Sequence, residues 1–373
     1  MVAVPAREGS IILPMPLPQE PSLAVVVVVY AAGDAIARSI AAVRDDLSWL
    51  HHTVVLHNGT PHISLAELTA LAPGCEVWAS ERNLGYAGAI NYALDHADTD
   101  LVGIWNDDAA PRLGALGAMV DAFRPGSTEG ERISAVTASI INQGEPEESC
   151  NGTLNLAGRI IPARFADRTH VLYPSGAAML LRGDLPFLAD PDYFLYYEDV
   201  YLGLTARLRG YRPVMAPEAK VDHLHHASMG SVNADELAFL RERNRLLTLW
   251  TIFSDETLPK LEAYWRQEEE LLRLTALVGH GKAAAVAKAK AWMKEHEDEV
   301  RKKREAIQAT RTVDDEALLA HFSYRLLSPS VPGATVFNRR AKRFCEENGL
   351  LTWDLREESK GRYPLPNLTG SFG

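Results

Sequence analysis

The chain has 373 residues, of which 47% are hydrophobic and 23% are charged. This is the composition of a globular protein with a sizeable core, and at roughly 150 residues per domain the length predicts two domains. With 38 basic and 49 acidic side chains the net charge is −11, which argues against a protein that coats nucleic acid or carries a broadly basic membrane-binding surface. We therefore expect no nucleic-acid partner.

The cysteines and the apolar runs indicate the cellular compartment of the protein and whether it spans a membrane. Three widely spaced cysteines (Cys75, Cys150 and Cys345) suit neither a disulfide framework nor a zinc cluster, which favours a reducing cytoplasm. The most apolar run, Leu23–Tyr30, is far shorter than the roughly 20 residues of a membrane-spanning helix. Prolines interrupt residues 1–21, so this segment is expected to be a flexible leader and not a secretory signal.

Strands alternate with helices through the first hundred residues. The predicted strands are Leu23–Tyr30, Thr53–Leu56, Cys75–Ala79 and Leu101–Trp105, and the predicted helices are Ala35–Leu50, Ser64–Leu71 and Ala87–His96. This order predicts an α/β fold with a mostly parallel, Rossmann-like sheet flanked by helices. Ligands of such sheets bind beyond the carboxyl ends of the strands, which directs attention to His57–Thr60, Asn83–Gly88 and Asn106–Ala109.

Further along, the pattern predicts strands at Ile133–Ile141 and Val171–Leu181 and a helix at Leu202–Arg209. From Ala234 to about Arg311 the chain is charged and rich in Ala and Leu, as in long helices. The last forty-odd residues are rich in Pro, Gly and Arg and predict an ordered tail or arm. The expected organisation is a leader (1–21), an α/β domain (22–232) and a helical C-terminal extension (233–373).

Two motifs follow predicted strands. Asn106-Asp107-Asp108 offers adjacent carboxylates that suit a hard divalent cation bridging phosphate oxygens, or alternatively a helix cap in a solvated loop. The glycine-containing loop from Asn83 to Gly88 enters a helix, where backbone amides can approach a diphosphate. The alternative is close helix–strand packing, and the loop lacks the full Gly-x-Gly-x-x-Gly pattern of dinucleotide-binding proteins.

Two further motifs lie downstream. Glu198 and Asp199 follow a run of aromatic residues, which describes a half-apolar pocket where a carboxylate can act as a base, or alternatively a capped helix start. Three histidines, His223, His225 and His226, stand within four residues and include candidate ligands for a manganese-like ion. A packed histidine is the alternative.

Taken in order, these motifs resemble the family 2 glycosyltransferases of the GT-A fold, in particular the bacterial rhamnosyltransferase- and galactofuranosyltransferase-like branch. The resemblance covers roughly residues 22–250. The segments that carry it are Asn83–Gly88, Asn106–Asp108, Ser175–Met179, Phe194–Val200, Gly210-Tyr211, His223 and Arg241–Arg245.

The resemblance implies roles for individual positions. Asp108 and His223 would bind Mn²⁺ or Mg²⁺, with His225 as the alternative ligand. Asp199 would be the catalytic base, with Glu198 as a supporting acid. The positions implied to bind the nucleotide are Tyr30, Asp34, His57, Asn58, Asn83, Gly88, Asn106 and Asp107.

Two positions depart from the family pattern. His57 stands where the family usually has an aspartate that contacts the base, so uridine, thymidine and guanosine donors all stay open. Asn106 replaces the first acid of the Asp-x-Asp motif and removes one negative charge from the metal site.

The function implied is an inverting, metal-dependent glycosyltransferase of the hexosyltransferase type. It would move a sugar from a nucleotide diphosphate donor to a hydroxyl of a glycan, lipid-linked glycan or secondary metabolite, as in cell-wall or polysaccharide biosynthesis. The departures at His57 and Asn106 motivate the alternative, a non-catalytic nucleotide-sugar-binding or scaffolding protein. A nucleotidyltransferase is disfavoured because Ala31–Asp34 contains no lysine.

The C-terminal helices leave three alternatives. Lys282–Gln308 is dense in Lys, Glu and Arg, which suits either a basic helix on the inner face of the membrane or a solvated helix with i,i+4 ion pairs. The leucines at 271, 272, 274 and 277 form an apolar cluster that favours dimerisation.

Overall fold

The computed structural model describes residues 17–30, 33–46, 52–123, 132–143, 153–161, 171–224, 233–276, 283–328, 331 and 333–359. The chain divides into two compact units. The first contains most residues up to Ala234, and the second contains Asp235 onward together with residues 152–164 and Arg207–Arg209. The second unit therefore includes a short hairpin from the middle of the chain.

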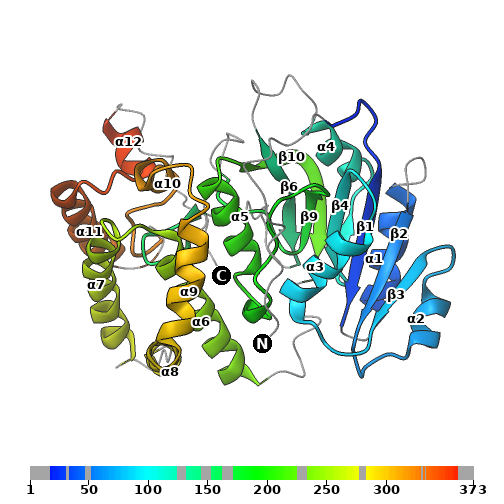
Figure 1. Ribbon diagram of the computed structural model, residues 1–373, viewed down its shortest axis with the longest axis horizontal. Helices are drawn as coiled ribbons and strands as arrows, with labels where there is room; N and C mark the ends of the chain where they lie inside the picture. Colours follow the sequence, from blue (N-terminus) through cyan, green and yellow to red (C-terminus); the bar gives the residue numbers. More distant parts are fainter. Residues whose placement is uncertain are drawn as a thin grey trace. The chain divides into compact units, whose positions relative to one another are not determined.

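The first unit is built on an eight-stranded sheet with the order β3-β2-β1-β4-β9-β6-β10-β5 (Figure 1). Its first half is parallel and contains β1 (Leu23–Val29), β2 (His52–Asn58), β3 (Glu76–Ser80) and β4 (Leu101–Asn106). Every residue of β1 is buried, as its unbroken β-branched run predicts for a strand covered on both faces. The helices of this half are α1 (Asp34–Asp46), α2 (Leu65–Leu71) and α3 (Gly85–His96).

The second half of the sheet is mixed. It contains β5 (Ala109–Pro111), β6 (Ile133–Asn142), β9 (Ala178–Arg182) and β10 (Arg212–His223), with the helices α4 (Ala115–Asp121) and α5 (Glu198–Leu208). Strand β9 runs antiparallel to both β4 and β6, and β5 runs antiparallel to β10. The predicted strand at Val171–Leu181 was too long, because only its end is a strand and residues 171–177 form an irregular, buried segment. That segment is important for the site.

The second unit is helical. Its helices are α6 (Ala234–Ile252), α7 (Leu258–Ala276), α8 (Ala283–Glu295), α9 (Glu297–Gln308), α10 (Asp315–Leu319), α11 (Ala334–Asn348) and α12 (Trp353–Ser359), and its hairpin pairs β7 (Thr153–Leu154) with β8 (Ile160–Ile161). Within the segment predicted to be an ordered tail or arm, residues 334–359 contain the helices α11 and α12. Helix α11 buries Ala341 and Cys345, so an apolar face outweighs the high Arg content of this segment.

Charged side chains cross-link the core of this unit. Glu242 on α6 and Glu268 on α7 are both buried, and Arg159 from the hairpin pairs with both. Arg245 binds Glu242 through two nitrogens, at 3.0 and 2.9 Å, and donates to the carbonyl of Ala157 at 2.5 Å. Each buried acid thus faces a buried base, as low-dielectric surroundings require.

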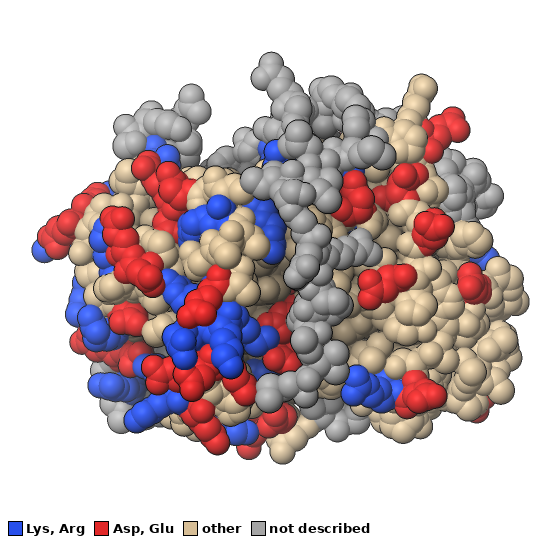
Figure 2. All heavy atoms as spheres, viewed as in Figure 1, with Lys and Arg blue, Asp and Glu red and all other residues tan. Residues whose placement is uncertain are grey.

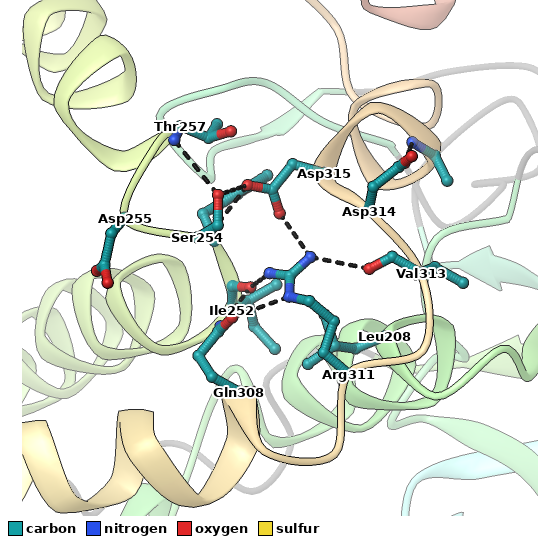
Figure 3. Close-up of polar contacts among 12 residues, drawn as sticks. Leu208, Ile252, Ser254, Asp255, Thr257, Gln308, Arg311, Val313, Asp314 and Asp315 are labelled. Atoms are coloured by element: carbon teal, nitrogen blue, oxygen red, sulfur yellow. Dashed lines mark hydrogen bonds and ion pairs between the residues drawn. The ribbon is translucent and has the colours of Figure 1, made fainter.

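Side chains from α9 and the residues after it close the C-terminal end of α6. The last carbonyls of a helix have no partner within it. Gln308 donates to the carbonyls of Thr251 and Ile252 at 2.7 and 2.8 Å, and Arg311 adds a bond to Ile252 at 2.6 Å. Figure 3 shows Arg311 pointing from there to Asp315, 2.8 Å away, which in turn accepts from Ser254.

The segment Lys282–Gln308 forms two helices, α8 and α9, and not a single one. Figure 2 shows blue and red side chains intermixed over this region. Ion pairs join Lys288 to Glu236 at 3.1 Å and Arg301 to Asp298 at 2.6 Å. None of the helices within the described ranges is long and apolar enough to cross a bilayer.

Candidate active site

Strand ends of the parallel half bring polar side chains together. Asp107 and Asp108 occupy the turn between β4 and β5 and are only 4% and 3% exposed. Tyr30, which follows β1, donates its backbone N–H to Asp107 Oδ2 at 3.0 Å. The ends of β1 and β4 are therefore joined by one of the predicted acids.

Asp108 lies against His223, 115 positions further along the chain. Strand β5 pairs with β10 so that Ala109 is opposite His223, and Asp108 Oδ1 lies 3.2 Å from His223 Nε2. The other ring nitrogen, Nδ1, lies 3.0 Å from Asn142 Oδ1. His225, the alternative ligand, is outside the described residues.

The contact between Asp108 and His223 can hold a proton or a metal ion between the two side chains. If Nδ1 donates to the amide oxygen of Asn142, then Nε2 presents a lone pair to the carboxylate of Asp108. Asp108 Oδ1 is buried and accepts no hydrogen bond from the described residues. Two acceptors that face each other repel unless a proton or a metal ion lies between them. A histidine that binds a metal through one ring nitrogen typically donates a hydrogen bond from the other, as His223 Nδ1 can to Asn142.

Glu198 and Asp199 begin α5 and form the second acidic pair. The Asp199 carboxylate accepts the N–H of Gly176 at 3.0 Å and that of Val200 at 2.7 Å. Burial raises the pKa of Asp199 to about 6, against the lowering effect of these two bonds. Its neighbour Glu198 is 6% exposed, and its Oε2 accepts no hydrogen bond from the described residues.

The two carboxyls differ in how readily they ionise. Burial, and then the negative charge of Asp199, hold the pKa of Glu198 well above its usual value. Because Asp199 has two N–H donors, it is the member that ionises first. A carboxylate that ionises before its neighbour is suited to act as a general base.

The segment before this pair is strained. Phe194, Tyr196 and Tyr197 have positive φ angles of 58°, 70° and 68°, a conformation that aromatic residues rarely adopt. Such strain persists only where surrounding contacts impose it, and it clusters at active sites. The main contact is the carbonyl of Phe194, which accepts the N–H groups of Tyr86 at 2.6 Å and Ala87 at 3.4 Å.

The glycine loop has its amides occupied within the chain. Asn58 accepts the N–H of Leu84 at 3.1 Å, and Asn83 accepts that of Gly85 at 2.8 Å. Gly85 has a φ of 68° and a Cβ there would lie 2.3 Å from Phe194 O, so the close approach requires glycine. The amides proposed to bind a diphosphate thus hold the loop in place, while the roles of Asn83 and Gly88 at the ligand stay predictions.

Three of the remaining residues that were predicted to bind the nucleotide have contacts in the structure. His57 Nε2 lies 2.9 Å from the carbonyl of Ile63, and the Tyr30 ring meets the ring of His62 at 5.7 Å. Asn106 is half-buried, and its carbonyl accepts the Ser39 hydroxyl at 3.2 Å. Asp34 begins α1, and its side chain is outside the described parts.

One residue not singled out from the sequence links the two acidic pairs. Burial, followed by the charges of Glu198, Asp199, Asp107 and Asp108, raises the pKa of Tyr86. All four carboxyls therefore act on a single phenol. Asn142 and Gly176 were also missed as site residues; Tyr86 and Gly176 lay within the quoted motifs, but only the fold shows what they contact.

A Rossmann-like half-sheet with acids at its carboxyl edge defines a nucleotide-binding α/β protein. Residues 24–179 match the family model described as glycosyl transferase family 2. Residues 24–179, less than half of the chain, thus resemble a family 2 glycosyltransferase domain, and the sheet that contains them has the GT-A fold. The match ends before Glu198, Asp199 and His223.

Three solved structures that align with this chain have TM-scores of 0.43 to 0.52. GalNAc-T7 with UDP, GalNAc and Mn²⁺ aligns with a TM-score of 0.52 and 14% identity over 74% of this chain and 55% of its own. This chain therefore spans about half the length of GalNAc-T7. The mannosyltransferase PcManGT from Pyrobaculum calidifontis, in complex with GDP-Man and Mn²⁺, aligns with a TM-score of 0.45, 16% identity and coverages of 91% and 90%. S. aureus TarS 1-349 aligns with a TM-score of 0.43 and 12% identity over 92% of this chain and 93% of its own. No protein of curated function matches the sequence significantly.

Proposed function

We propose that this protein transfers a sugar from a nucleoside diphosphate sugar to an acceptor hydroxyl, with inversion at the anomeric carbon. The observation that carries the proposal is that two N–H donors hold the Asp199 carboxyl, and that Tyr86 lies within the electrostatic reach of both this carboxyl and the Asp107–Asp108 turn. One carboxylate can serve as the base of a single in-line displacement.

The reaction is a displacement at one carbon. The acceptor hydroxyl oxygen attacks the anomeric carbon and forms the new C–O bond. The bond from that carbon to the diphosphate oxygen breaks, and its electron pair stays on the diphosphate. The hydroxyl proton passes to the Asp199 carboxylate.

Asp108 and His223 would hold a divalent cation, because Asp108 Oδ1 and His223 Nε2 lie 3.2 Å apart and this oxygen accepts no hydrogen bond from the described residues. When bound, Mn²⁺ or Mg²⁺ supplies positive charge that stabilises the departing diphosphate. The GalNAc-T7 structure, which contains UDP and Mn²⁺ on the same fold, supports this choice. Asn142 holds the histidine ring at its other nitrogen.

The nucleotide would lie at the carboxyl edge of the parallel strands. We propose that Tyr30 and Asp34 lie near the base, and that Asp107 lies near the ribose or the metal. The other residues proposed to line this pocket are His57, Asn58, Asn83, Gly88 and Asn106. These residues do not specify the nucleobase, since the His57 ring contacts the carbonyl of Ile63 in its own loop.

The acceptor is proposed to be a glycan, a lipid-linked glycan or a small metabolite, as for the rhamnosyl- and galactofuranosyltransferase-like branch in cell-wall or polysaccharide synthesis. We place the reaction in the cytoplasm. The ion pairs of Lys288 and Arg301 favour a solvated surface over α8 and α9. Peripheral membrane contact and self-association stay predictions.

The test combines binding with turnover. Thermal shift against a panel of nucleoside diphosphates and their sugars, with and without Mn²⁺, should show stabilisation by at least one donor. Asp108→Ala should abolish the part of the shift that depends on Mn²⁺, whereas Asp199→Asn should keep the shift and lose transfer. If no donor shifts the wild-type protein, or if both variants keep full transfer, the proposal fails.

A further inference from the structure

Tyr86 makes two hydrogen bonds to carbonyls that are distant from it in the chain. Its backbone N–H donates to Phe194 at 2.6 Å, and its hydroxyl donates to Gly176. It lies in the first turn of α3, so one residue ties this helix to two irregular segments. Neither bond forms part of regular secondary structure.

Both segments support Asp199. Gly176, whose carbonyl accepts the Tyr86 hydroxyl, donates its own N–H to Asp199 Oδ2 at 3.0 Å. A Cβ built on Gly176 would lie 3.4 Å from Asp199 Oδ2 and 3.4 Å from Tyr86 Cε1, so the carboxylate, the glycine and the phenol ring are in contact. Phe194 begins the strained segment that leads directly into Glu198 and Asp199.

The phenol itself is unsuited to proton transfer. Burial and four nearby acids raise the pKa of Tyr86 well above its usual value of 10.0, so the hydroxyl stays protonated. Its proton is engaged by the carbonyl of Gly176. A group of this kind holds geometry and does not exchange protons with an acceptor.

We propose that Tyr86 is the positioning residue of the catalytic base: its hydroxyl fixes Gly176, whose N–H orients Asp199, and its N–H fixes the strained segment that carries Asp199. This inference rests on the proposed function, because it assigns Tyr86 a task in the step where Asp199 takes the acceptor proton. Tyr86 contacts neither reacting atom in this account and acts through Gly176 and Phe194.

Tyr86→Phe removes only the hydroxyl and leaves the N–H bond to Phe194. Since small misplacements of a catalytic group are costly, kcat should fall about 10- to 100-fold. The KM for the donor should stay within about 2-fold, because uniform donor binding is untouched. The acid limb of kcat should move to higher pH, since a weaker Gly176 bond raises the pKa of Asp199.

The matched control is Tyr92→Phe on the same helix. The Tyr92 ring stacks on His96 at 3.8 Å, away from the two acidic pairs, and this variant should keep both kcat and the pH profile.

A carbon-13 titration of the Asp199 carboxyl in the wild type and in Tyr86→Phe provides a measurement that needs no turnover. An upward shift of this pKa in the variant supports the inference even if no donor is turned over, in which case the proposed function alone has failed. An unchanged Asp199 pKa overturns the inference. So does a loss of kcat without movement of the acid limb, or a loss that appears only in the donor KM.

Discussion

Buried carboxyl groups have different partners in the two units of this protein. In the second unit, Glu242 is 4% exposed and is bound by Arg159 and Arg245. Burial alone would raise its pKa, but these two charges and their hydrogen bonds lower it. In the first unit, Glu198 is 6% exposed, its Oε2 accepts no bond from the described residues, and its pKa is raised well above normal.

The difference separates structural from functional burial. A buried ion pair that is fully bonded holds helices together, and breaking one side leaves an uncompensated charge. A buried acid without a basic partner costs stability and persists where its chemistry is needed. This difference supports our proposal that the Glu198–Asp199 pair belongs to an active site, and it indicates a structural role for the Glu242 network.

The largest effect is expected from Asp199→Asn. The amide has the same shape and can still accept the Gly176 N–H, but it cannot take a proton from the acceptor. Transfer should fall about 10²- to 10⁴-fold, as for other general bases. Initial rates at saturating donor, with melting curves as the control for folding, measure this.

Stability should move the opposite way in that variant, because the negative charge beside Glu198 is removed. A melting temperature equal to or above that of the wild type is expected. If Asp199→Asn loses several degrees and keeps its activity, the comparison between the two units is wrong.

Glu242→Gln should lower the free energy of unfolding and leave the transfer activity unchanged. It leaves Arg159 and Arg245 without one of their two acids, and breaking a buried pair costs about 3–5 kcal/mol. Urea denaturation measures the loss. Glu305→Gln is the matched control: its partner Arg301 lies 3.4 Å away on the exposed surface of α9, where pairs contribute about 0–1 kcal/mol. Equal losses in both variants would contradict a structural role for the network.

The sequence predicted the parallel half of the sheet because its signals are local. The run Leu23–Val29 and the acids at Asp107 and Asp108 follow from strand burial and the strand-end rule. The contact between Asp108 and His223 depends on the pairing of β5 with β10, which no local pattern specifies. For that pair the resemblance to a family supplied what periodicity could not.

Other features were out of reach for a different reason. Tyr86 acts through carbonyls of Phe194 and Gly176, and backbone acceptors leave no trace in the sequence. The glycine loop was predicted to offer its amides to a ligand, but Asn58 and Asn83 occupy two of them. The sequence shows which groups can form a hydrogen bond, but it does not show which partner each group takes in the fold.

The pH dependence of stability should have opposite signs for the two acid groups. The pKa of Asp199 rises from 3.8 to about 6 on folding, so between these values the native state binds more protons and stability falls as pH increases. The pKa of Glu242 falls below its usual 4.5, so its stabilisation is present above that value and is lost as pH decreases below it.

Melting temperatures across the range from acid to neutral pH test both signs. Asp199→Asn should flatten the decline between about pH 4 and 6, and Glu242→Gln should flatten the decline on the acid side. A variant that shifts the whole curve without changing either slope would show that its carboxyl does not titrate differently on folding.

The smallest effect is expected at the end of α6. Gln308→Ala removes two bonds to the carbonyls of Thr251 and Ile252, although Arg311 keeps its bond to Ile252 (Figure 3). Since one of the two carbonyls retains a donor, the loss should be about 1 kcal/mol, or about 2–4 °C in melting temperature. Gln308→Glu sharpens the test: it keeps an acceptor for the Arg311 Nε–H, which lies 2.9 Å from Gln308 Oε1, but it replaces the donor to the two carbonyls with a carboxylate oxygen, so it should also lower stability. Transfer activity should be unchanged in both, since these bonds belong to the scaffold; a fall in kcat at full stability would place this helix end in the catalytic machinery.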